Sequence, residues 1–163
     1  MTDEAARVSP KPIIVLGADH AGFRTKDAIA DALRGEGYRV EDFGTSSEES
    51  VDYPDYARRV GERVASHADE LGILVCGTGI GMSIAANKVE GVRAAVAHDL
   101  ATARLAREHN DANVLTLGAR VVDNTAAIQI VREFLAAQFA GGRHQRRVDK
   151  ITELDETRVP HRS

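Results

Sequence analysis

Five short apolar runs alternate with longer amphipathic stretches, and this alternation constrains the fold more than any other feature of the sequence. The runs are of strand length and cover Pro12–Leu16, Tyr38–Phe43, Leu71–Cys76, Val92–Ala97 and Val114–Leu117. Strands that alternate with helices indicate a parallel sheet with helices on both faces. At 163 residues the chain has the length of one domain. We therefore predict a single-domain, Rossmann-like α/β fold, a doubly wound three-layer α/β/α sandwich around a five-stranded parallel sheet.

The limits of this domain follow from composition. Residues 1–11 are mostly polar or small and predict a disordered N-terminal extension, residues 12–156 the domain itself, and residues 157–163 a flexible tail. A last long helix is predicted from Asp123 or Asn124 to the glycines at 141 and 142. Its predicted inward face consists of Ile128, Val131, Leu135 and Phe139. A basic segment follows this helix and leads into a short final helix.

Charge and composition argue against several classes of partner. The formal net charge is −4, which disfavours nucleic-acid binding driven by bulk charge. Aromatic residues make up only 4% of the chain, so a base-stacking platform is not expected. No apolar run approaches the roughly 18 residues of a membrane span, and no signal peptide is visible. The one cysteine cannot form an intrachain disulfide. We expect a soluble cytoplasmic protein without nucleic-acid or membrane partners.

Ligands of doubly wound sheets bind beyond the carboxyl ends of the strands, so the residues after each apolar run are the candidates. The most informative stretch, Cys76–Gly81, follows the third run and reads CGTGIG. Alternate glycines let a ligand approach the backbone, and their N–H groups can converge on an anion. A thiolate is stabilised at the start of a helix. The stretch supplies a candidate base and a candidate oxyanion site, although a tight turn after a buried core cysteine is the alternative.

Further candidates follow other predicted elements. Asp19 and His20 end the first strand, where a carboxylate can hold a substrate hydroxyl and an imidazole can bind phosphate or move a proton. A helix cap and a solvated histidine are the alternatives. His109 and Asn110 end the fourth helix, where the charged imidazole is favoured and suits a general acid, although from the residues alone simple helix capping is the preferred interpretation. His98 follows the fourth strand and is given no role.

Arginines supply the candidate phosphate ligands. Arg143 and Arg147 lie in the basic segment, and Arg120 lies just past the fifth strand. Arginine suits bidentate recognition of phosphate, although a run of charges is more often simply solvated. The His, Cys and Asp residues lack the spacing of known metal sites, so no metal is expected.

Five stretches together resemble the type B ribose-5-phosphate isomerases, in the family that includes galactose-6-phosphate isomerase subunits. They are Gly17–Gly22, Asp52–Pro54, Cys76–Lys88, Arg107–Asn110 and Gly141–Arg147. The resemblance covers nearly the whole chain and implies a cofactor-free aldose–ketose isomerase of the pentose phosphate pathway. This enzyme would interconvert ribose 5-phosphate and ribulose 5-phosphate through an enediolate. The alternatives are an isomerase of tetrulose 4-phosphate, allose 6-phosphate or galactose 6-phosphate, and a non-catalytic sugar-phosphate sensor.

The resemblance also implies roles for single residues. Cys76 would be the catalytic base that moves a proton between C1 and C2. Thr78 and His109 would open the furanose ring while Asp19 holds the ring oxygen or a hydroxyl. The backbone of the glycine loop, Gly77, Gly79 and Gly81, would bind the enediolate.

The remaining residues implied by the resemblance bind the two ends of the sugar phosphate. Asn110 and Tyr53 would line the sugar. The phosphate ligands would be His20, Arg120, Arg143 and Arg147. Members of the family are homodimers or dimers of dimers with shared active sites, so the neighbouring chain would supply His109 and the arginine segment.

Overall fold

Five parallel strands form the central layer of the protein, in the order β2-β1-β3-β5-β4. The structure is a computed structural model that describes residues 9–158. The strands are β1 (Ile13–Ala18), β2 (Val40–Asp42), β3 (Glu70–Cys76), β4 (Ala94–Val96) and β5 (Val114–Gly118). The predicted five-stranded parallel sheet is confirmed. The predictions for residues 1–8 and 159–163 lie outside the described residues.

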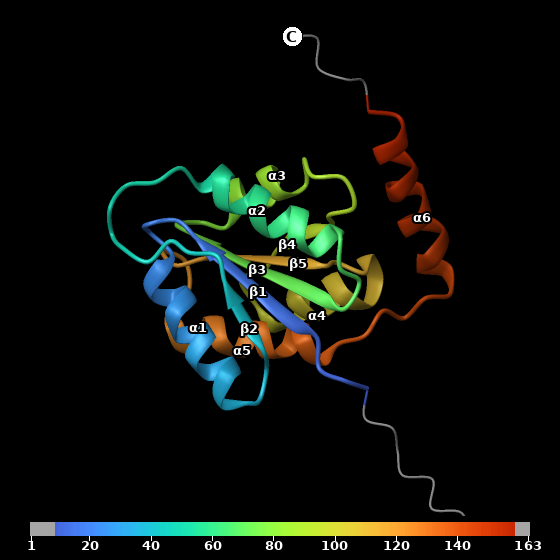
Figure 1. Ribbon diagram of the computed structural model, residues 1–163. Coiled ribbons are helices and arrows are strands. Elements are labelled where there is room, and N and C mark those ends of the chain that lie inside the picture. Colours follow the sequence, from blue (N-terminus) through green and yellow to red (C-terminus); the bar gives the residue numbers. More distant parts are fainter. Residues whose placement is uncertain (1–8, 159–163) are drawn as a thin grey trace, which may run out of the picture.

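Helices cover both faces of the sheet, which confirms the three layers (Figure 1). One face packs against α1 (Phe23–Gly35), α4 (Leu100–Asn110) and α5 (Asn124–Ala136). The other face packs against α2 (Tyr53–Ala65) and α3 (Ile80–Ala86). The last helix, α6 (Arg143–Glu156), stands apart on the right of Figure 1, contacts α4 and buries only Val148.

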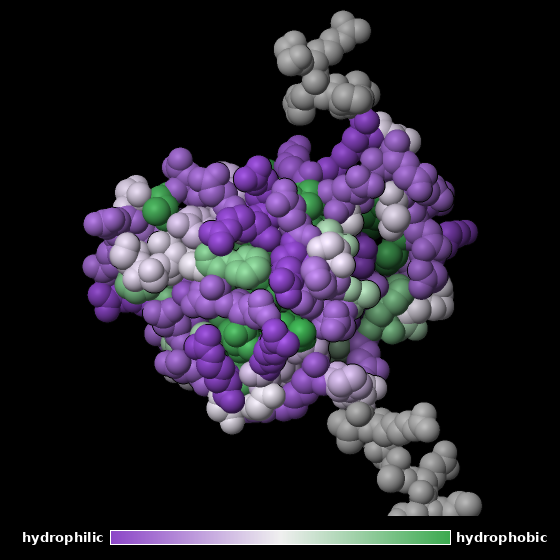
Figure 2. All heavy atoms as spheres, in the orientation of Figure 1, coloured by the Kyte–Doolittle hydropathy of each residue, from purple (hydrophilic) through white to green (hydrophobic). Residues whose placement is uncertain are grey.

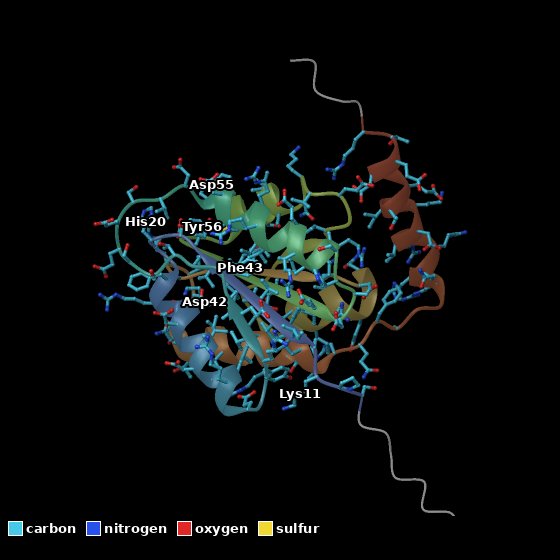
Figure 3. All side chains as sticks on the ribbon, in the orientation of Figure 1. Lys11, His20, Asp42, Phe43, Asp55 and Tyr56 are labelled. Atoms are coloured by element: carbon cyan, nitrogen blue, oxygen red, sulfur yellow. The ribbon has the colours of Figure 1, made fainter. Side chains whose placement is uncertain are left out.

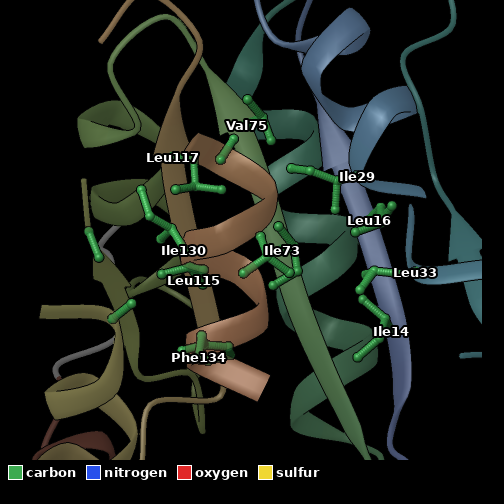
Figure 4. Close-up of a cluster of buried hydrophobic side chains, with 14 of the residues drawn as sticks. Ile14, Leu16, Ile29, Leu33, Ile73, Val75, Leu115, Leu117, Ile130 and Phe134 are labelled. Atoms are coloured by element: carbon green, nitrogen blue, oxygen red, sulfur yellow. The ribbon is translucent and has the colours of Figure 1, made fainter. Parts of the chain in front are cut away.

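Alternate side chains of the central strands enter two separate cores because successive residues of a strand point to opposite faces. Ile73 and Val75 of β3 join the core beneath α1 and α5, which Figure 4 shows with residues of all three central strands. Leu74 and Cys76 join the core beneath α2 and α3. Burial on both faces explains why the strand sequences are continuously apolar. It also fixes the face to which Cys76 points.

Several predicted element boundaries were wrong. The strands β2 and β4 are three residues long rather than six, because each lies at an edge of the sheet and pairs on one side only. The helix α5 ends at Ala136 rather than near Gly141. Its buried face is shifted from the predicted one and comprises Ala127, Ile130, Val131 and Phe134. The basic segment is itself the start of α6.

The surface carries little continuous apolar area on the face drawn in Figure 2, where hydrophobic patches are small and separated by hydrophilic side chains. Among residues 9–158, no helix combines the length and the hydropathy that a membrane crossing requires.

A buried ion pair fastens α2 to the start of β3. The carboxylate of Glu70 is only 1% exposed and accepts two hydrogen bonds of 2.7 Å, from Nε and Nη2 of Arg63. These hydrogen bonds hold the pKa of Glu70 below its usual value of 4.5, and the charge of Arg63 adds to them. The stabilisation is therefore complete above pH 4.5 and is lost as the pH falls through the lower, folded-state pKa.

Replacing Glu70 with glutamine should lower the free energy of unfolding by about 1–3 kcal/mol at pH 7, because the guanidinium loses the nearer of its two carboxylate partners and keeps only Glu41, at 3.7 Å. The difference from the unchanged protein should shrink as the pH falls towards 4. Urea unfolding at both pH values measures it. Glu62→Gln is the matched control, since Glu62 lies next to Arg63 on α2 and is 61% exposed. A difference of the same size at both pH values would contradict this account of the ion pair.

Candidate active site

The three central strands are parallel, so their carboxyl ends lie side by side on the same side of the sheet. The chain leaves β1 for the edge strand β2 and then returns across β1 to β3, so the strand order reverses between β1 and β3. Such a reversal leaves a crevice in which ligands of this fold class bind. Asp19 and His20 follow β1, Cys76 ends β3 and is followed by the glycine loop, and Arg120 follows β5. The structure thus brings these predicted site residues to the same edge.

The glycine loop after β3 wraps around the sulfur of Cys76. The backbone N–H of Gly79 donates a hydrogen bond to Sγ at 3.1 Å. Gly79 has a φ of 76°, in the left-handed region that favours glycine. A Cβ atom there would lie 2.8 Å from the carbonyl carbon of Leu117. No other residue type fits this position without displacing β5, so glycine is what brings the amide to the sulfur.

Cys76 is more buried than expected for a base that lies at the opening of a ligand-binding loop. It belongs to the core beneath α2 and α3 and keeps 5% of its surface exposed. The side chain of Arg120 lies over the loop at Gly77, where a Cβ atom would be 2.9 Å from Nη1. The ring of Tyr53 lies over Gly81, where a Cβ atom would be 2.6 Å from Cζ. Two of the predicted substrate-binding side chains therefore border the loop.

The residues after β1 hold the start of α1 and the loop that leads to α2. Oδ1 of Asp19 accepts hydrogen bonds from the N–H groups of Ala21 and Gly22, at 3.0 and 3.1 Å. Nδ1 of His20 accepts one from the N–H of Val51 at 3.2 Å, which leaves Nε2 as its donor when the ring is neutral. In Figure 3 His20 lies at the same end as Asp55 and Tyr56 of α2.

Hydrogen bonds of two threonines and one histidine hold the glycine loop and the end of β5 in place. Oγ1 of Thr78 accepts a hydrogen bond from the N–H of Ile80 at 3.3 Å, and Oγ1 of Thr116 donates one to the Gly79 carbonyl at 2.8 Å. Nε2 of His98 accepts the N–H of Gly118 at 3.1 Å. No role was predicted for His98. Its place directly after a strand, at the same edge, was the available signal.

The remaining predicted site residues lie on the opposite side of the sheet, near the amino ends of the strands. The helix α4 starts at the carboxyl edge and runs back, so His109 and Asn110 at its end lie near the amino end of β3. From Glu70 to Cys76 that strand spans about 20 Å. Arg143 and Arg147 begin α6, which packs against α4. Within one chain, these four residues are thus separated from Cys76 by the length of the sheet. Figure 1 shows the same separation between α6, on the right, and the carboxyl end of β1, on the left.

The ring of His109 stacks on that of His144 in α6. The ring centroids are 4.2 Å apart and the planes are 14° from parallel. Asn110 borders a cavity of about 310 Å³ that also touches Arg93 and Ile151. Among residues 9–158, no group of three or more His, Cys, Asp or Glu side chains is placed to hold a metal ion.

Comparison with known proteins places this geometry in context. Residues 14–151 match the family described as Ribose/Galactose Isomerase. The chain is 49% identical over 145 residues to ribose-5-phosphate isomerase B of Escherichia coli K12, covering 89% of this chain and 97% of the relative.

Two solved structures are equally similar in fold. Ribose-5-phosphate isomerase B of Clostridium thermocellum is 54% identical with a TM-score of 0.86, covering 88% of this chain and 97% of that one. The enzyme of the same name from Mycoplasma genitalium, solved with bound ribulose-5-phosphate, is 45% identical with a TM-score of 0.86, covering 89% and 97%.

Proposed function

This chain belongs to the ribose/galactose isomerase family, and from that membership we propose that it interconverts ribose 5-phosphate and ribulose 5-phosphate. The observation that carries the proposal is the loop after β3, in which a backbone amide donates to the single cysteine beside further loop amides. The ribulose-5-phosphate bound to the Mycoplasma genitalium enzyme supports the substrate class. The single cysteine fits a reducing compartment, so we place the reaction in the cytoplasm.

Cys76 is the proposed base. Its thiolate takes the proton from C2 of the open-chain aldose, the electrons form a C1–C2 double bond, and the carbonyl oxygen becomes the enediolate oxygen. The thiol then returns the proton to C1 while a proton passes from O2 to O1, which gives the ketose. N–H groups of Gly77 and Gly81 are the proposed oxyanion donors, each able to contribute about 3 kcal/mol, while the N–H of Gly79 donates to the sulfur. Every atom and electron pair stays within the substrate and the thiol, so no cofactor is required.

The other residues are proposed to prepare and hold the sugar. Thr78 and His109 open the furanose ring, with Asp19 at the ring oxygen or a hydroxyl. Tyr53 and Asn110 line the sugar. The proposed phosphate ligands are His20, Arg120, Arg143 and Arg147. Binding energy at the phosphate orients the distant reacting end of the substrate.

A second copy of the chain completes each site in this proposal. Within one chain, Cys76 and His109 lie towards opposite ends of β3, a strand about 20 Å long, and this separation is too large for both to act on one sugar. Large apolar side chains are exposed on the elements beside the glycine loop, where a partner could cover them. They are Ile80 and Ile84 of α3, Val96 of β4 and Leu100 of α4, each at least 40% exposed. We therefore propose a homodimer, alone or as half of a dimer of dimers.

Mixing two inactive variants tests the shared site. Cys76→Ser and His109→Asn should each be nearly inactive alone. In a mixed dimer one site combines both changes and the other has neither, so random mixing should restore about a quarter of the normal sites. Denaturing and refolding the two variants together, and then measuring turnover, checks this. If each site lay within one chain, the mixture would stay as inactive as its parts.

Turnover on a panel of sugar phosphates tests the substrate. We expect the highest kcat/KM with ribose 5-phosphate, and lower values with allose 6-phosphate, galactose 6-phosphate and a tetrulose 4-phosphate. Incorporation of solvent deuterium into the sugar separates an isomerase from a sugar-phosphate sensor, since only the former exchanges a C–H proton. A preference for another sugar of the panel would reassign the substrate. Binding without exchange would overturn the enzymatic proposal.

A further inference from the structure

The stacked imidazoles of His109 and His144 join two elements that carry otherwise separate parts of the proposed site. His109 ends α4, and His144 lies in the first turn of α6. Their rings are nearly parallel at 4.2 Å, and both side chains are partly buried. Neutral rings can stack at this distance, whereas two protonated rings would repel each other. The stack therefore accommodates one proton far better than two.

Groups that carry or can gain a positive charge face His144. They are His109 across the stack and Arg143 and Arg147 on its own helix. Partial removal from water, followed by these positive charges, holds the pKa of His144 below its usual value of 6.5. Near neutral pH, His144 is therefore neutral while the site is free of anions.

We propose that the phosphate group of the substrate draws one proton from solvent onto the His109–His144 pair. The inference rests on the proposed function, in which Arg143 and Arg147 hold that phosphate. A phosphate dianion between these arginines cancels their two positive charges, and its own negative charge favours the protonated imidazole. Because the rings share the site, the proton belongs to the pair rather than to one residue.

His144 is thus a positioning residue for His109, the residue proposed to act at the furanose ring. The phosphate does more than anchor the sugar, because it also supplies the pair with the proton that ring opening needs. An unphosphorylated sugar would leave His144 neutral. Substrate selection and acid–base readiness are then coupled through one pair of rings.

Calorimetry of ligand binding tests the proton uptake directly. Ribitol 5-phosphate is the probe, since it carries the phosphate but has no carbonyl group to isomerise. Titrations at pH 7.0 in HEPES and in Tris, whose ionisation enthalpies differ, give the number of protons taken up per site. The unchanged protein should take up about one proton per site. His144→Phe keeps a planar ring for stacking but cannot titrate, and it should lose at least about half of that uptake while still binding the probe.

The matched control is His67→Asn, since His67 is an exposed histidine at the end of α2. Its proton uptake should equal that of the unchanged protein. Probe binding without proton uptake by the unchanged protein would overturn the inference and leave the isomerase proposal intact. Undiminished uptake in His144→Phe would overturn it too. Absence of probe binding, together with absence of ribose 5-phosphate turnover, would instead contradict the proposed function. If His144→Phe does not fold, the uptake by the unchanged protein decides.

Discussion

Replacing Cys76 with serine should lower kcat by about 10²–10⁴-fold, because a hydroxyl group at this position remains protonated where a thiol can ionise. The fold should survive, since Oγ of serine is smaller than Sγ and can still accept the hydrogen bond from the N–H of Gly79. Initial rates with ribose 5-phosphate measure the loss, and urea unfolding reports the fold. Turnover within tenfold of the unchanged protein would remove Cys76 from the role of base.

Alkylation provides an independent check on the same thiol. The chain has one cysteine, so the incorporation of iodoacetamide reports this position alone. Activity should fall in step with alkylation, and a bound sugar phosphate should slow both. Alkylation that proceeds to completion without loss of activity would contradict the proposed chemistry.

Replacing Gly79 with alanine should lower the free energy of unfolding by about 2–4 kcal/mol, the sum of an unfavourable positive φ and a backbone clash. The added Cβ would lie 2.8 Å from the carbonyl carbon of Leu117, in the strand β5 that packs between two neighbours. The strand β5 cannot move without breaking its pairing with β3 and β4. Any protein that folds should also have a reduced kcat, because the loop amide leaves the sulfur.

Gly35→Ala is the matched control for this prediction. Gly35 ends α1, and nothing lies within 4 Å of the position that its Cβ atom would occupy. That variant should be unchanged or slightly more stable, by up to about 1 kcal/mol. Urea unfolding and initial rates compare both variants with the unchanged protein. Equal stability of the two alanine variants would show that the loop tolerates a side chain at position 79.

The sheet was predictable because burial on both faces leaves a strong local pattern of continuous apolar residues. The edge strands and the inward face of α5 were less predictable. Ile128 and Val131 have the spacing of one helix face, but the packed face is centred on Ile130 and Phe134. Sequence spacing alone does not say which side of an apolar helix meets the sheet, and tertiary packing decided it.

The candidate site also contains residues that the sequence predicts and contacts that it does not. Residues directly after strands, such as Asp19 and Cys76, were placed correctly because parallel strands end at a common edge. The support that His98 gives to Gly118 depends on a contact between β4 and β5, which the sequence does not encode as a motif. The stack of His109 on His144 joins residues 35 positions apart and depends on where α6 docks.

The separation of His109 from Cys76 has a consequence for the working enzyme. If neither half can act without the other chain, catalysis per molecule must decline on dilution, with a midpoint set by how tightly the copies associate. A cell that makes only a few copies would then hold mostly idle chains. Expression level would act as a threshold for the reaction, rather than as a simple multiplier of its rate.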